Sequence, residues 1–170
     1  RYFIPLGENL EIWQFQVTNL RAEPVELDAF ASIEFCLWDA MDDSSNFQRN
    51  FNIGQVEIEE DVIYHKTEYK ERRNHYAYYS VNAPIKGFDT DRETFFGLYN
   101  GFDEPQVVAS GNPTNTVAHG WSPIASHCLE VTLQPGESKD FIFVLGYVEN
   151  REEEKWESNG VINKTKAKAT

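Results

Sequence analysis

Apolar and mostly polar side chains alternate through Val25-Glu26-Leu27-Asp28-Ala29-Phe30-Ala31-Ser32-Ile33-Glu34-Phe35-Cys36-Leu37. Side chains of a β-strand point alternately to its two faces, so the odd-numbered residues share one apolar face. The other face begins with carboxylates and then carries Phe30, Cys36 and Trp38. The pattern predicts a long strand with one face in a core and a second face that becomes covered toward its end.

The same two-residue period recurs along the chain between turn residues. We expect further strands at residues 13–18, 56–59, 62–69, 76–81, 129–133 and 141–147. The last two flank a Pro-Gly turn at 134–138 and form the clearest hairpin. Residues 89–93 resemble a helix start, which predicts a short helix over 94–99. Strands joined by such turns predict a mainly β fold, an antiparallel β-sandwich with one or two short helices.

Two segments depart from the strand pattern. Residues 101–126 are rich in Gly, Pro, Asn and Ser and form a long excursion, which is either functional or packed on a neighbour. From Glu149 the sequence is charged and helical in pattern, with a Lys-rich end. We therefore assign residues 1–150 to a β-sandwich domain and residues 151–170 to the start of a charged helical linker. Because the chain opens without Met on an apolar strand pattern, we expect it to be a fragment.

Composition narrows the class of protein. The 170 residues contain 41% hydrophobic side chains, enough for one domain with a sizeable core. A net charge of -13 repels phosphate backbones and anionic lipids, so neither nucleic acid nor membrane is an expected partner. Cys36 and Cys128 lie far apart, without a second Cys or a His at metal-ligand spacing, and are expected to be buried thiols. Without a disulfide framework, a signal-peptide pattern or a long apolar run, the expected compartment is the cytoplasm.

Few residues form a candidate site by spacing alone. The 4 histidines occur singly, so no metal site is expected; they are His65, His75, His119 and His127. Carboxylates cluster at Asp42-Asp43, at 59–61, at Asp89 with Asp91 and at 152–154, where solvated turns explain them. The charged cluster at 71–75 is either a set of salt bridges or an anion site.

A polar loop after the first long strand offers donors suited to sugar hydroxyls. It contains Asn46, Gln48 and Arg49, whose amide and guanidinium groups can orient hydroxyls. Aromatic rings can also stack on sugars, and Trp38, Trp121 and Trp156 are candidates, although core positions are the commoner fate of Trp. One alternative is therefore a stand-alone carbohydrate-binding β-sandwich module.

Ordered motifs spread over nearly the whole chain carry a family resemblance. They are Pro5-Leu6-Gly7-Glu8-Asn9, Ile33-Glu34-Phe35-Cys36-Leu37-Trp38, Asn46-Phe47-Gln48-Arg49-Asn50, Tyr64-His65-Lys66-Thr67-Glu68-Tyr69, Gly87-Phe88-Asp89-Thr90-Asp91-Arg92 and Leu145-Gly146-Tyr147-Val148-Glu149-Asn150. In this order they resemble the cellobiose phosphorylases of glycoside hydrolase family 94, formerly glycosyltransferase family 36.

The resemblance implies a cytoplasmic homodimer that cleaves cellobiose with inorganic phosphate, with inversion, to α-glucose 1-phosphate and glucose. It implies no metal and no organic cofactor. It also implies that this chain is the later part of an N-terminal, galactose-mutarotase-like supersandwich. The catalytic Asp and most phosphate ligands of such enzymes belong to an (α/α)6 barrel, so no catalytic residue is expected in this chain.

The resemblance also implies a role for the polar loop. Asn46, Gln48 and Arg49 match a loop that, in this family, reaches the partner subunit's active site and contacts the acceptor-side sugar. Phe47 stands where some relatives have Tyr. We expect Arg49 to position the leaving glucose by charge-assisted hydrogen bonds, without transferring a proton.

Overall fold

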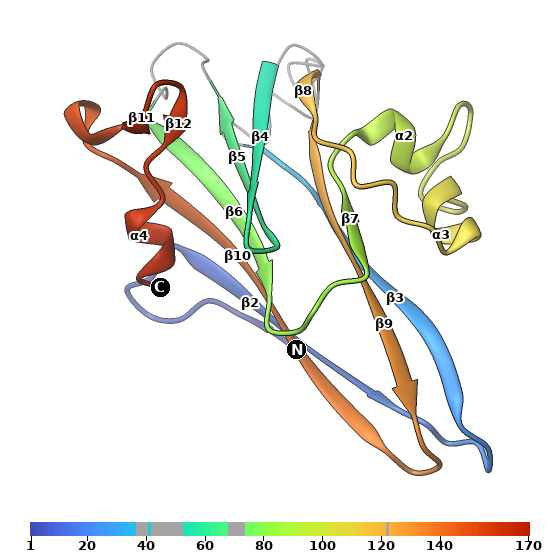
Figure 1. Ribbon diagram of the computed structural model, residues 1–170. Helices are drawn as coiled ribbons and strands as arrows, with labels where there is room; N and C mark the ends of the chain where they lie inside the picture. The colour runs from blue at the N-terminus through green and yellow to red at the C-terminus, as the bar shows by residue number, and fades with distance from the viewer. Residues whose placement is uncertain (37–40, 42–52, 68–73, 122) are drawn as a thin grey trace.

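The structure is a computed structural model that describes residues 1–36, 41, 53–67, 74–121 and 123–170. Within these residues, two antiparallel sheets face each other (Figure 1). The seven-stranded sheet has the order β1 (Tyr2–Phe3), β2 (Leu10–Thr18), β10 (Ser138–Glu149), β6 (His75–Val81), β5 (Val62–Thr67), β4 (Ile53–Glu59) and β8 (His119–Trp121). The three-stranded sheet has the order β3 (Val25–Glu34), β9 (Ile124–Leu133) and β7 (Gly87–Asp89). The predicted mainly β antiparallel sandwich is confirmed.

The core lies between the sheets, as the alternation in β3 predicts. In the smaller sheet Leu27 lies opposite Val131 and Ala29 lies opposite Leu129. These side chains pack in one cluster with Tyr79 of β6. The sheets are joined at one end by the turns 19–24 and 134–137, which bond to each other through backbone groups, and they diverge toward the opposite end (Figure 1).

Each sheet also has a covered outer face. On the larger sheet Tyr76 and Tyr78 pack under Ile162 and Ala167 of the C-terminal segment. On the smaller sheet a second cluster joins two short helices, α2 (Arg92–Phe96) and α3 (Gln106–Ser110), to β9; its members are Phe95, Phe96, Val107, Ile124 and the partly buried Phe30. The covered second face that the sequence predicts for the long strand is the face carrying Phe30.

The predicted short helix is confirmed as α2, with its start at Arg92. The Asp91 side chain caps it by accepting a hydrogen bond from the Thr94 N–H at 2.7 Å. Gly97 ends the helix with φ 84, a conformation that side chains disfavour. The excursion at 101–126 contains α3, β8 and the first residues of β9, and its Val107 and Ile124 are buried.

The C-terminal segment is only partly helical. It consists of a 3-10 turn η3 (Glu152–Glu154), the hairpin β11 (Trp156–Ser158) and β12 (Val161–Ile162), and α4 (Thr165–Lys168). The segment folds back on the outer face of the larger sheet. The domain boundary at residue 150 stays a prediction.

Burial differs from expectation at Cys36 and Asp89. Cys128 is buried, as expected, but Cys36 is exposed because β3 ends at Glu34 and the sheets have already diverged there. Asp89 is 0% exposed, so a solvated turn was the wrong interpretation for this carboxylate. In the described part of the chain no helix has the length and apolar character needed to cross a bilayer.

Candidate functional site

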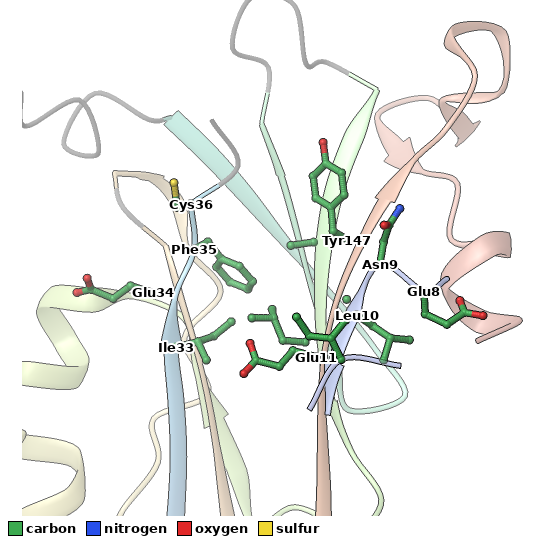
Figure 2. A pocket seen from close by; sticks show the side chains of 13 residues that line it. Glu8, Asn9, Leu10, Glu11, Ile33, Glu34, Phe35, Cys36 and Tyr147 are labelled. Atoms are coloured by element: carbon green, nitrogen blue, oxygen red, sulfur yellow. The ribbon is translucent and has the colours of Figure 1, made fainter. Parts of the chain in front are cut away.

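A cavity of about 480 Å³ lies between the sheets at the end where they diverge (Figure 2). One wall comes from Ile4 and residues 8–11, which precede and begin β2. The opposite wall is the end of β3 with the two residues that follow it, 33–36. Ala77 of β6 and residues 145–147 of β10 close the back. The cavity thus brings together segments that are distant in the sequence. Its two main walls face each other because β2 and β3 belong to different sheets.

The lining of the cavity is mostly apolar. Phe35 projects into it and the Glu11 side chain is turned toward it, while Glu8 and Glu34 point away from it in Figure 2. Glu34 accepts a hydrogen bond from Arg92 Nε at 2.7 Å, which directs it toward α2. Such a lining suits an apolar ligand or a segment of polypeptide. It does not supply an acid and a base facing one reacting atom, which hydrolytic chemistry would need.

His65 lies behind the cavity wall and is held by packing. Its ring is parallel to that of Phe35, with centroids 4.5 Å apart. Burial lowers the pKa of His65 to about 3, so the ring is neutral at pH 7. Both ring nitrogens lack a hydrogen-bond partner within the described residues. Over the same residues, no group of three or more His, Cys, Asp or Glu side chains could hold a metal ion.

A charged cluster on the outer face of the larger sheet is internally neutralised. Glu57 of β4 receives Lys66 Nζ at 2.6 Å and Lys164 Nζ at 2.7 Å. Burial opposes ionisation of Glu57, but hydrogen bonds from Lys164 and Lys66 outweigh it and hold the pKa below its usual value. Lys66 Nζ also lies 4.9 Å from the Trp156 ring centroid and Lys155 Nζ lies 4.1 Å from it. These cations are engaged inside the protein, so the cluster fixes the C-terminal segment and offers no anion site.

Asp89 has a structural role that the sequence did not reveal. Its Oδ1 accepts a hydrogen bond from the Thr114 N–H at 3.0 Å and another from the Thr114 hydroxyl. Burial raises the pKa of Asp89, and the bonds from Thr114 and Thr116 partly oppose that effect. The carboxylate thus ties β7 to the segment after α3, across a gap of 25 residues that gives no local signal.

The predicted sugar-contacting residues lie outside the described part of the chain. These residues are Asn46, Gln48 and Arg49. Trp38 and residues 71–73 lie outside it as well, and so does the side chain of Trp121. What the structure adds is the cavity, whose rim includes Cys36. The sequence indicated one wall of this cavity, because the apolar odd-numbered face of the long strand continues through Phe35. It did not indicate the opposite wall.

Two facing antiparallel sheets with this inter-sheet cavity define a β-sandwich domain. The chain matches the family described as "Glycosyl hydrolase 94, supersandwich domain" over residues 1–162 and belongs to it. It is 25% identical over 149 residues to an N,N'-diacetylchitobiose phosphorylase of Vibrio furnissii, covering 85% of this chain and 18% of that protein. It is 28% identical to the protein of the same description from Vibrio proteolyticus, with the same coverage.

A relative with another described substrate also matches. The chain is 24% identical over 152 residues to a 3-O-beta-D-glucopyranosyl-beta-D-glucuronide phosphorylase of Paenibacillus borealis, covering 89% of this chain and 20% of that protein. This chain therefore spans about a fifth of the length of the curated relatives it matches.

Proposed function

We propose that this chain is the supersandwich part of a disaccharide phosphorylase that cleaves cellobiose with inorganic phosphate. The supporting observation is the family match over residues 1–162, together with relatives that are all described as phosphorylases of disaccharides or related glycosides. The preference for cellobiose rests on the ordered motifs quoted above. The products would be α-glucose 1-phosphate and glucose, with phosphate as the only co-substrate.

Within such an enzyme this part would supply subunit contacts and one loop that contacts the substrate. We propose that Asn46, Gln48 and Arg49 contact the acceptor-side sugar across a homodimer in the cytoplasm. The catalytic Asp would lie in a separate domain.

N,N'-diacetylchitobiose is the second candidate substrate. Two relatives that match 85% of this chain carry that description. The two disaccharides differ by acetamido groups in place of hydroxyls, and a pocket that pairs with one group disfavours the other because buried polar atoms lose their partners.

The test is phosphorolysis by the full natural polypeptide. Cellobiose, N,N'-diacetylchitobiose and 3-O-β-glucosyl-glucuronide are each incubated with and without inorganic phosphate, and the sugar 1-phosphate is quantified. We expect glucose 1-phosphate from cellobiose, and only when phosphate is present. Turnover of N,N'-diacetylchitobiose instead supports the second candidate. Turnover of no disaccharide refutes the enzyme proposal, and heat released on titration of cello-oligosaccharides would then favour a carbohydrate-binding module.

A further inference from the structure

The segment that carries the proposed sugar contacts leaves one sheet and enters the other. It runs from the end of β3 to Ile53, the first residue of β4. We call residues 34–36 its outgoing stem and residues 53–55 its returning stem. Both stems lie at the end where the sheets diverge (Figure 1). Because β3 and β4 belong to different sheets, backbone pairing does not set the distance between the stems, and side-chain contacts must set it.

His65 of β5 contacts both stems. Its ring lies parallel to the ring of Phe35 in the outgoing stem, with centroids 4.5 Å apart and an angle of 7° between the planes. In the returning stem, Gly54 lies against the Nε2 edge of the same ring: a Cβ on Gly54 would overlap Nε2 and lie 2.9 Å from Cδ2. Only glycine allows such a close approach of backbone to ring. One side chain therefore bridges the two stems.

Packing fixes the position of this ring. His65 is 4% exposed, and its partners in the register of the neighbouring strands are Val56 and Ala77. Neither ring nitrogen has a hydrogen-bond partner within the described residues. Burial lowers the pKa of His65 to about 3, so the ring is neutral at pH 7 and acts through its shape. A planar ring fits beside Phe35, whereas a branched aliphatic side chain is thicker and would push the stems apart.

The outgoing stem is also held on its other side. Phe35 projects into the cavity and Glu34 points away from it (Figure 2). Glu34 accepts a hydrogen bond from Arg92 Nε of α2 at 2.7 Å. Phe35 is thus fixed to the larger sheet through His65, while Glu34 is fixed to α2. The outgoing stem cannot shift without loss of one of these contacts.

We propose that His65 is a positioning residue that sets the separation of the two stems and thereby places the acceptor-side sugar contacts between them. This inference rests on the proposed function, which assigns those contacts to Asn46, Gln48 and Arg49. His65 touches no substrate in this role and acts through Phe35 and the backbone of Gly54. Such an indirect role has large kinetic effects, because a displacement of about 1 Å caused by a remote mutation can lower a rate roughly 100-fold.

Gly54→Ala in the full natural polypeptide tests the proposal, since the added methyl displaces the His65 ring and leaves the sugar-contacting residues unchanged. We expect kcat/KM for the disaccharide that the wild type cleaves to fall roughly 10- to 100-fold, mainly through KM. KM for phosphate should change by less than about twofold. Ile58→Ala is the control: it truncates an inner-face side chain of the same strand, opposite Ile63, and should lower Tm without changing either KM.

His65→Ala is a second variant that removes the ring, and we expect the same selective rise in KM for the disaccharide. In the His65→Ala background, Gly54→Ala meets no ring and should lower kcat/KM by less than about twofold further. A full additional loss in the double variant overturns the proposal. So do equal changes in both KM values, or a change in Tm alone, for Gly54→Ala and His65→Ala in an active enzyme. A wild type that cleaves no disaccharide refutes the proposed function itself, and this inference with it.

Discussion

At the scale of single residues, His65 couples the stability of the sandwich to pH. It is 4% exposed, stacks on Phe35 and has no hydrogen-bond partner within the described residues. Its pKa falls from 6.5 to about 3 because burial disfavours the charged ring. In the unfolded chain the same ring takes up a proton as the pH drops below about 6.5. Between pH 6.5 and 3 the unfolded state therefore binds more protons, and the free energy of unfolding decreases as the pH falls.

We predict that His65→Leu weakens the acid sensitivity of the protein. Leu has a similar volume and does not titrate, so the loss of up to about 1.4 kcal/mol per pH unit from this group should disappear. Thermal unfolding at pH 7 and pH 5 measures the effect: the difference in Tm should be smaller in the variant. Val56→Ala, opposite His65 in the register, is the matched core control and should lower Tm equally at both pH values. If His65→Leu shows the wild-type difference, His65 does not carry the pH dependence.

Residue environments were only partly predictable from the sequence. Cys128 lies within an apolar alternating run and is buried, as such a run indicates. Cys36 continues an equally apolar run but is exposed, since its environment depends on where the two sheets separate. Asp89 is buried, and Thr114 and Thr116 of a distant segment donate to its Oδ1. Local pattern predicts the orientation of a side chain, whereas the partner that covers it is decided by topology.

At the scale of elements, the C-terminal segment is fastened by charge as well as by apolar contact. Glu57 lies between Lys66 and Lys164, whose side chains are 5% and 3% exposed, and its Oε1 accepts the Ile162 N–H at 3.1 Å. Glu57 is the carboxylate that both buried cations share, although Lys164 Nζ also lies 3.4 Å from Glu59, and its removal would leave both without full compensation.

We predict that Glu57→Gln destabilises the protein by about 3 kcal/mol, because it leaves two buried ammonium groups beside a neutral amide. Cleavage of residues 151–170 by trypsin should also become faster than in wild type. Chemical denaturation and limited proteolysis measure the two effects. Glu59→Gln is the control: Glu59 also meets Lys164, but its side chain is 37% exposed, so the loss should be much smaller. Equal losses in the two variants would exclude a special role for Glu57.

The strands could be predicted because alternation is a local signal. The C-terminal segment could not be predicted, because its structure depends on contacts with residues far away in the sequence. Alternation alone located β3 and the hairpin of β9 and β10, although β9 begins at Ile124, within the stretch expected to be an excursion. The charges from Glu149 onward suggest a solvated helix, yet Lys164 is buried by its pairing with Glu57, 107 residues away. Lysines of this segment lie against the larger sheet, where Glu57 and Glu59 of β4 supply the counter-charges.

At the scale of the whole molecule, each sheet has a covered outer face, while the space between the sheets opens at one end. The turns 19–24 and 134–137 close the other end. The cavity could not be foreseen from periodicity, because β2 and β3 follow one another in sequence yet enter different sheets. Asn46, Gln48 and Arg49 came from resemblance to a family and remain a prediction.

The proposed division of labour predicts a specific kinetic defect for Arg49→Ala in the full natural polypeptide. A guanidinium that positions the leaving sugar contributes roughly 1.5–3 kcal/mol through charge-assisted hydrogen bonds, which corresponds to about a 10- to 150-fold fall in kcat/KM. If these bonds form with the disaccharide and not with phosphate, KM for the disaccharide should rise far more than KM for phosphate. Initial rates measured with each substrate varied in turn separate the two constants. Equal effects on both would refute an acceptor-side role for Arg49.

Two controls distinguish substrate contact from assembly. Arg21→Ala removes the same charge from an exposed turn between β2 and β3 and should leave both constants unchanged. Size-exclusion chromatography of Arg49→Ala shows whether the oligomeric state is preserved. Loss of the dimer together with activity would mean that Arg49 serves subunit contact, since a positioning residue can be removed without separating the subunits. A dimer that keeps phosphate affinity but binds disaccharide weakly is the result that acceptor positioning requires.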